Sequence, residues 1–384
     1  MKFDAKKLLK RFLCCALAVL ALVLPTSCAK DEDYTKYGSD MKEKVFYGVD
    51  NDGKLVHGSV MTPGMFNFFL SEQKSTFLLT FMYNDPTITG DSEEIWQRIA
   101  PDGKTYEEKF FGEVVKSAKE LVAANTLLYM MPSAQEPDKT YTLPSDYVEY
   151  VKSLVLKNAA EKYGSVMDFE AYLANFSATI EDYTALYLMT ANIDLLKEAL
   201  FNNNGYVFTD AEFRDYYEKN YYCANHIYVN TAADTKIDGT LSPLDQEESA
   251  KREALAKEIE LFIKSGGNMQ EAKEMYTESF VQVYENVAEM DINNTTANAP
   301  ELGEALKKLR VGETVSAKSA YGVHIIKRVE TVPENFARNE KTLLSIKSAL
   351  SNTAYSKLLE EQSSRVSADE NLLSSFSMKD AVLP

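Results

Sequence analysis

The feature that most constrains the fold is a change of hydrophobic period near residue 223 of this 384-residue chain. Upstream, apolar residues recur at the spacing of amphipathic helices, as in the stripe of Leu186, Met189, Ile193, Leu196 and Leu200. Downstream, the short β-branched runs "HIYVN" (226–230) and "HIIKRVE" (324–330) are typical of strands. The helical patterns between these runs cover 246–267, 268–276 and 299–309. This order predicts a compact α+β domain at 223–332, inserted between helical segments.

Capping signals mark the starts of helices in the flanking regions, at Thr62-Pro63 and at Thr209-Glu212. The tail carries one more apolar stripe, made of Leu343, Ile346, Leu350, Ala354 and Leu358. Because such a stripe must be buried, we expect the C-terminal helix in 333–384 to pack on the helical region at 45–222. The predicted fold class is therefore α+β, with a helical lobe and an inserted α+β domain.

The first residues have the composition of an export signal. Basic residues precede an uninterrupted apolar run of 13 residues at 12–24. That length suits the core of a signal peptide and falls short of the roughly 20 residues that span a bilayer. The letters "TSC" that follow resemble a bacterial lipobox, in which Cys28 is lipidated. We expect a signal peptide at 1–27, a lipid anchor and tether at 28–44, and a location on the extracytoplasmic side of a bacterial cell membrane. A plain secretory signal is the alternative.

Composition excludes several kinds of partner and site. The formal net charge is −17 at pH 7, and loss of the basic segment 1–27 makes it more negative. So acidic a chain repels nucleic-acid phosphates, so we expect no nucleic-acid partner and membrane attachment only through the lipid. Beyond Cys28 the sequence holds one cysteine, Cys223, which excludes an intrachain disulfide. Because the sequence has no CxxC pair and no two histidines one helical turn apart, we predict no metal site and no cofactor.

Three stretches carry a family resemblance. They are "ANHIYV" at the first strand, "GGNMQEAKEMYTES" at the second helix and "APELGEALKKLRVGETVSAKSAYGVHIIK" at the end. Their order and spacing resemble a parvulin-type peptidyl-prolyl isomerase domain. The helical segments on either side resemble those of exported foldase lipoproteins of the PrsA and SurA type, whose flanking helices form a chaperone lobe. The resemblance implies that His226 and His324 are catalytic and meet near the centre of the sheet, beneath the place where the prolyl bond rotates.

The same resemblance implies a substrate pocket. Its apolar positions correspond here to Met290, Asn298 and Leu302, and the family's cysteine or aspartate falls at Ser279 or the neighbouring Glu278. Prolyl isomerisation needs no covalent step, because its barrier of about 18–20 kcal/mol comes from amide resonance. A dry apolar pocket lowers that barrier by favouring the twisted imide. Since Asn298 is polar and "NVAEMDIN" replaces the family's glycine-rich segment, the pattern supports the fold and leaves turnover open.

Three functions are compatible with these residues. The first is a lipid-anchored peptidyl-prolyl cis–trans isomerase that assists the folding of exported proteins. The second is a holdase chaperone with a degenerate parvulin-like domain, which Asn298 and methionine-bearing helices such as "MFNFFL" favour. The third is an extracytoplasmic scaffold lipoprotein. In the first two, the partners are unfolded or proline-containing exported polypeptides.

Overall fold

The computed structural model describes residues 43–132, 140–201, 207–235 and 241–384. The predicted signal peptide and the predicted lipid acceptor, Cys28, lie outside the described residues. The chain forms two compact units, one that includes the described residues up to 201 together with 354–384, and one that spans 207–353. Helices and sheets occur in both units, so the predicted α+β class is confirmed.

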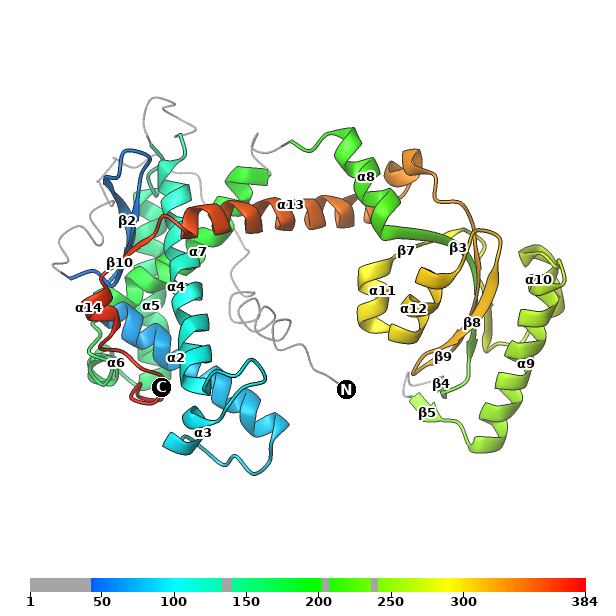
Figure 1. The fold of residues 1–384 in the computed structure, drawn as a ribbon, viewed down its shortest axis with the longest axis horizontal. Coiled ribbons are helices and arrows are strands. Elements are labelled where there is room, and N and C mark those ends of the chain that lie inside the picture. Colours follow the sequence, from blue (N-terminus) through cyan, green and yellow to red (C-terminus); the bar gives the residue numbers. More distant parts are fainter. Residues whose placement is uncertain (1–42, 133–139, 202–206, 236–240) are drawn as a thin grey trace. The chain divides into compact units, whose positions relative to one another are not determined.

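The first unit consists mainly of helices that pack on a small sheet (Figure 1). The sheet has the order β10-β1-β2, with β1 (Phe46–Val49), β2 (Leu55–Met61) and β10 (Ser367–Ala368). The helices are α2 (Pro63–Asn84), α3 (Glu93–Gln97), α4 (Tyr106–Met130), α5 (Ser145–Tyr163), α6 (Val166–Ala174), α7 (Ile180–Phe201) and α14 (Glu370–Leu373). Because β10 and α14 follow the second unit in the sequence, the chain returns to the first unit at its end.

The predicted helix starts are confirmed by side-chain caps. Thr62 accepts a hydrogen bond from the backbone of Met65 over 3.1 Å, and Pro63 occupies the first helical position of α2. In the second unit, Thr209 and Glu212 form the expected capping box at the start of α8 (Asp210–Asn220). Each cap satisfies backbone donors that a helix start leaves without partners, which fixes where the helix begins.

The second unit is built on a five-stranded sheet with helices on both faces (Figure 1). The strands run in the order β6-β3-β9-β8, and β7 also pairs with β3. Their bounds are β3 (Tyr221–Asn230), β6 (Val281–Val283), β7 (Ala288–Asp291), β8 (Thr314–Lys318) and β9 (Gly322–Arg328). A separate small pair, β4 (Ala233–Thr235) and β5 (Leu241–Pro243), follows β3. The helices that cover the sheet are α9 (Gln246–Lys264), α10 (Met269–Met275), α11 (Ile292–Asn298) and α12 (Pro300–Lys308).

Alternate residues of each strand face opposite helical layers, as the two-residue period of a strand requires. On one face, Ile227, Val229 and Ile325 pack with Ile259 and Ile263 of α9 in one apolar cluster. On the other face, an apolar cluster joins the residues Ala224, Ile326, Ala317, Ile292, Leu302 and Leu306. That second cluster contains Ala224, near the start of β3. The later residues of β3 on this face, His226 and Tyr228, are not part of the cluster.

The second unit, 207–353, extends on both sides of the 223–332 stretch that carries the family resemblance. The second unit begins before β3 with α8, whose Tyr217 stacks on Tyr221 at a ring distance of 5.1 Å. It also takes in the 3-10 helix η2 (Pro333–Ala337) and the first part of α13 (Glu340–Ser363). There Ile346 packs with Tyr217 and Phe336, whereas Leu359, later in α13, packs in the core of the first unit. One long helix serves two cores because its successive turns lie far apart along its axis.

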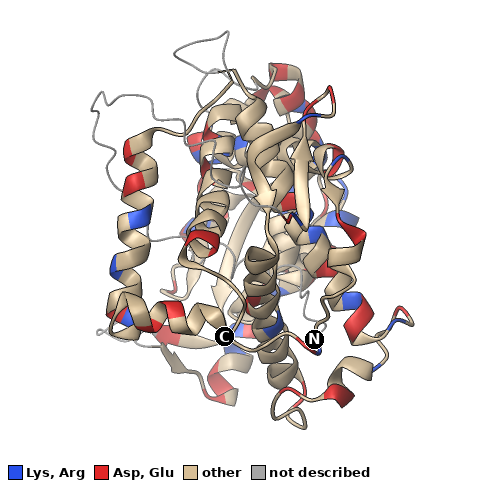
Figure 2. Cartoon of the chain, turned by 90° about the vertical axis from the view of Figure 1, so that its left-hand side faces the viewer, with Lys and Arg blue, Asp and Glu red and all other residues tan. Residues whose placement is uncertain are grey.

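Charged residues are interspersed on the helices of the face that Figure 2 turns toward the viewer. Basic and acidic positions alternate there instead of gathering into a basic stripe. This pattern agrees with the acidic composition of the chain, whose net charge is −17. In the described part of the chain, no helix combines the length and the apolar composition that crossing a membrane requires.

Candidate active site

The two histidines predicted to meet do so in the second unit. On the antiparallel strands β3 and β9, His226 lies opposite Ile326, and Tyr228 lies opposite His324. The histidines are therefore diagonal neighbours on one face of the sheet. Their rings approach closely, with 3.0 Å between His226 Nε2 and His324 Nδ1. The spatial prediction from the sequence is confirmed, and the catalytic role of the pair stays a prediction.

Close contact between the two strands depends on Gly322, the first residue of β9. A Cβ atom at this position would lie 2.2 Å from the carbonyl oxygen of Val229 on β3. Any larger residue would push the strands apart at the end of the sheet where the histidines lie. The glycine in the sequence "YGVH" thus keeps β9 close enough to β3 for the rings to meet.

A serine completes the hydrogen-bonded group. Ser319 Oγ lies 3.0 Å from His324 Nε2 and 3.3 Å from the carbonyl oxygen of Gly322, to which the hydroxyl donates. His324 Nε2–H then donates to Ser319, and His226 Nε2–H donates to His324 Nδ1. Every ring nitrogen of this short relay except Nδ1 of His226 has a partner, so the two imidazoles are held in fixed orientations.

Burial keeps both imidazoles neutral. The His226 side chain belongs to a residue that is only 8% exposed. Burial, followed by the nearby imidazole of His324, lowers the pKa of His226 to about 4 from the ordinary value of 6.5. Burial also lowers the pKa of His324. At neutral pH the pair therefore presents a polar but uncharged surface.

Two tyrosine rings contact the pair, and a third tyrosine, three residues before His324, is bonded to one of them through its backbone. The ring of Tyr284 stacks on His226 at 4.6 Å and 5°, and the Tyr228 ring lies 5.1 Å from that of His324. The Tyr228 hydroxyl donates to the carbonyl oxygen of Tyr321 over 2.8 Å. Tyr321 is 68% exposed and Tyr284 is 38% exposed. We call Tyr228, Tyr284 and Tyr321 the tyrosine rim.

The sequence prediction did not include the rim or Ser319, although part of the signal was present. In "HIYVN", Tyr228 follows His226 by two residues, so the strand period places both on one face. Tyr284 had no such signal. It follows β6 directly, and its backbone N–H donates to the carbonyl of His226 over 3.0 Å, a contact that depends on how a later strand pairs with β3.

The predicted pocket residues differ in their surroundings. Leu302 is 6% exposed and lies in the apolar cluster under α12, and Met290 of β7 packs against the same cluster. Both are on the sheet face that carries the histidines. Asn298 is exposed at the end of α11, and its side-chain amide donates to the backbone and the side chain of Asn294, each over 3.0 Å. The role of Met290, Asn298 and Leu302 as a substrate pocket stays a prediction.

Within the ranges that the structure describes, no hydrogen bond joins the side chains of Glu278 and Ser279 to the histidine pair, so their catalytic role stays a prediction. Both are exposed in the loop that connects α10 to β6. Among the described residues, the hydroxyl that bonds a histidine of the pair is that of Ser319. Glu289 on β7 links β7 to α8 and α13, because its carboxylate accepts hydrogen bonds from Tyr217 over 2.8 Å and from Thr342 over 2.6 Å.

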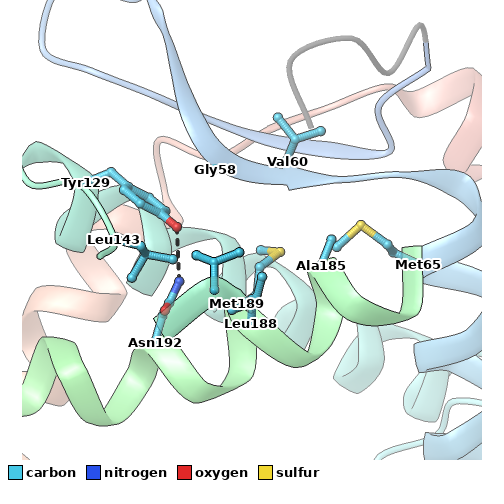
Figure 3. Close-up of a pocket in the computed structure, with 10 residues that line it drawn as sticks. Gly58, Val60, Met65, Tyr129, Leu143, Ala185, Leu188, Met189 and Asn192 are labelled. Atoms are coloured by element: carbon cyan, nitrogen blue, oxygen red, sulfur yellow. Dashed lines mark hydrogen bonds between the residues drawn. The ribbon is translucent and has the colours of Figure 1, made fainter. Parts of the chain in front are cut away.

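The first unit contains a small cavity lined by residues of β2, α4 and α7 (Figure 3). Apolar side chains such as Leu143 and Met189 form most of its wall. Its polar members are linked, because the side-chain amide of Asn192 donates to the Tyr129 hydroxyl over 3.2 Å. Its volume of about 20 Å³ holds about one water molecule, whereas small-molecule pockets measure about 300–1,000 Å³. The cavity is too small for a substrate or a cofactor.

In 43–132, 140–201, 207–235 and 241–384, the structure contains no group of three or more His, Cys, Asp or Glu side chains that could hold a metal ion. The one cysteine in these ranges, Cys223, is buried and has its sulfur 3.4 Å from the Tyr217 hydroxyl.

The chain matches no protein-family model and no curated protein. It is similar to several solved structures, including three of PrsA proteins. The first, PrsA from Bacillus subtilis, is 20% identical with a TM-score of 0.23, over 75% of this chain and 99% of that one. The second, peptidylprolyl isomerase (PrsA) from Bacillus anthracis, is 17% identical with a TM-score of 0.21, over 64% and 95%. The third, foldase protein PrsA from Streptococcus pneumoniae, is 14% identical with a TM-score of 0.25, over 73% and 97%. TM-scores this low leave the functional argument to the chain's own residues.

Proposed function

We propose that this chain is a foldase of exported proteins that isomerises prolyl peptide bonds at the histidine pair. The observation that carries the proposal is the 3.0 Å contact between His226 and His324 beside the exposed tyrosine rim. A buried, uncharged imidazole pair at the edge of an aromatic surface offers polar anchoring next to apolar area. The resemblance to parvulin-type domains in the sequence supports the same activity.

The proposed mechanism uses binding and no covalent step. The tyrosine rim would bind the proline ring, since aromatic side chains provide large and rigid apolar surfaces. Rotation about the imide bond removes its resonance and reduces its polarity in the transition state. A neutral surface with little water favours that less polar state over the planar ground state, which is what lowers the barrier. His226 and His324 would position the rim and keep this surface uncharged.

The proposal is tested by NMR exchange spectroscopy on a proline-containing peptide with the full chain. We expect wild-type protein to accelerate cis–trans exchange, and His324→Ala to reduce kcat/KM by roughly tenfold or more. The matched control is His57→Ala, because His57 is an exposed histidine on β2 in the first unit. If cis–trans exchange in the presence of wild-type protein stays at the uncatalysed rate, the isomerase proposal is contradicted.

A holdase is the second candidate, and two observations favour it. Leu302 is buried in the core and Asn298 bonds its own helix, so neither offers an open apolar surface to a proline ring. A holdase would suppress the aggregation of an unfolded protein without accelerating exchange. Under this alternative, His324→Ala leaves suppression of aggregation unchanged, whereas removal of the tyrosine rim weakens it.

We also propose that the chain is exported and anchored by a lipid on Cys28, on the extracytoplasmic side of the cell membrane. The basic leader, the 13-residue apolar run and the "TSC" letters support this proposal. Metabolic labelling with a fatty acid tests it. Label should enter the wild-type protein and be lost in Cys28→Ala, and a labelled Cys28→Ala protein would contradict it.

A further inference from the structure

The end of the chain is seated in the first unit beside α2, shown in red in Figure 1. Residues 377–382, with the sequence "SMKDAV", form a single turn in which the Ala381 N–H donates to the Ser377 carbonyl over 3.2 Å. Met378 is fully buried and Ala381 is 7% exposed, and both belong to the core cluster of that unit. One turn has almost no stability of its own, so contacts with the surrounding helices hold this segment, which we call the tail.

Side chains of α4 and α2 make polar contacts with the tail near its start and near its end. At its start, the carboxylate of Glu107 on α4 accepts the backbone N–H groups of Met378 and Lys379, over 2.6 and 2.9 Å. Near its end, Lys74 Nζ on α2 donates to the carbonyl oxygens of Lys379 and Ala381, over 3.0 and 2.7 Å. All of these partners in the tail are main-chain atoms.

Ser71, one turn before Lys74 on α2, adds a contact of the same kind. Its hydroxyl donates to the backbone carbonyl of Val382. Main-chain groups are the same in every polypeptide, so these contacts do not select a sequence. Selection is confined to the buried Met378 side chain, whose place accepts an apolar residue. Methionine is the side chain that adapts best to such a site.

Lys74 provides the strongest argument that the site is made to receive a peptide. The residue is 0% exposed, and a buried ammonium group requires partners for its donors. One partner is permanent, since Asp91 lies 2.6 Å away and itself accepts a hydrogen bond from Trp96 over 2.7 Å. The other two partners are the tail carbonyls. Without a peptide, two donors of a lysine in an apolar wall have no protein partner.

We propose that Ser71, Lys74 and Glu107 form a groove for unfolded polypeptide, which the tail occupies until a client segment with an apolar side chain displaces it. This tail groove shares with the proposed function only the class of ligand, and it lies in a different unit from the histidines. Because the tail is tethered, it competes at an effective concentration near millimolar. The groove therefore opens to clients that are locally concentrated, as nascent exported chains are.

The test uses a fluorescein-labelled peptide of residues 376–384 and fluorescence anisotropy. In the full chain, Met378→Ser loosens the tail and leaves the groove intact, so we expect the variant to bind the peptide at least about tenfold more tightly than wild type. A chain that stops after Phe376 should bind at least as well. Leu383→Ser is the matched control, because Leu383 lies in the same segment but is 41% exposed, and it should behave as wild type.

Two further measurements separate a client groove from a structural clamp. Reduced, carboxymethylated α-lactalbumin should compete with the labelled peptide for Met378→Ser protein, whereas native α-lactalbumin should not. Ser71→Ala in the Met378→Ser background should weaken capture several-fold. The proposal is overturned if both tail variants fold and fail to capture the peptide, if both fail to fold, or if the unfolded competitor has no effect. Cis–trans exchange plays no part in these readouts, so the isomerase proposal fails or stands separately.

Discussion

The two faces of the sheet in the second unit are built differently. On the face toward α9, Ile227, Val229 and Ile325 pack in a continuous aliphatic cluster, and Ile227 and Val229 are fully buried. On the opposite face of the same strands, His226, Tyr228 and His324 take the alternate positions. One set of strands therefore supports an aliphatic core on one side and, beside a second apolar cluster, a polar and partly open patch on the other.

The contrast indicates which face gives up stability to hold polar side chains. A buried histidine contributes less to stability than an aliphatic residue, because a polar group must be desolvated and then given partners. Here the partners are supplied by Ser319, Tyr284 and the second histidine. We therefore expect changes on the aliphatic face to act mainly on stability and changes at the histidine pair to act on the proposed activity. The predictions that follow test this division, in order of decreasing effect on stability.

Ile227→Ala should have the largest effect. The side chain is fully buried, and truncation of a buried isoleucine to alanine costs about 2–5 kcal/mol. Urea unfolding followed by circular dichroism measures this loss. The residual folded protein should retain its prolyl exchange activity per folded molecule. A loss below about 1 kcal/mol would contradict the assignment of this face to stability.

Acidification should have the next largest effect, through His226. The unfolded state binds a proton near pH 6.5, while the folded state resists protonation until about pH 4. The unfolded state thus binds more protons in this window, so stability is full above pH 6.5 and falls as the pH drops toward 4. Between about pH 7 and about pH 4.5, wild type should lose about 2 kcal/mol more than His226→Phe, which keeps a ring against Tyr284. Equal losses in the two proteins would show that His226 is not protected from protons.

Ser319→Ala and Ser316→Ala form a matched pair on opposite faces of the sheet. Ser319 bonds His324, whereas Ser316 of β8 donates to the buried carboxylate of Glu260 on α9 over 2.9 Å. Ser316→Ala loses one side-chain hydrogen bond and should cost about 0.5–1.5 kcal/mol in urea unfolding. Ser319→Ala also loses the longer bonds to the Gly322 carbonyl and the Tyr321 N–H, so it should cost at least as much. Only Ser319→Ala should slow cis–trans exchange, because only this residue orients the histidine pair. An equal effect of both on exchange would remove the functional difference between the faces.

Tyr321→Ala should have the smallest effect on stability. The residue is 68% exposed, so the free energy of unfolding should change by less than about 0.5 kcal/mol. Affinity for a proline-containing peptide should fall several-fold, because the tyrosine rim loses its most exposed ring. Isothermal titration calorimetry measures the affinity. Unchanged binding would exclude this ring from the proposed surface.

Much of the second unit could be predicted from local patterns. The runs "HIYVN" and "HIIKRVE" predicted strands, because alternation and β-branched residues are strand signals. The structure has the strands β3 and β9 at these runs. The capping box at Thr209-Glu212 fixed the start of α8 because the cap is made by residues adjacent in sequence. The prediction that the two histidines meet came from the family resemblance. The register between β3 and β9 is the physical reason that they do.

Features that depend on tertiary contacts could not be predicted. The strands β6 and β7 are short, and they exist because both pair with β3 along the same edge. Ser319 could not be singled out from the sequence, because only the pairing of β8 with β9 brings its hydroxyl to His324. The sequence also did not indicate that the two parts of α13 belong to different units. One continuous apolar stripe does not show which core each turn contacts.

The most direct test of the central claim is an NMR spectrum of the full chain with 15N-labelled histidine. The sequence has only three histidines, so the ring signals of His57, His226 and His324 can be assigned by single substitutions. When a proline-containing peptide is added, the signals of His226 and His324 should shift and that of the exposed His57 should not. Shifts confined to His57, or no shift at saturating peptide, would contradict the claim that the histidine face binds the substrate.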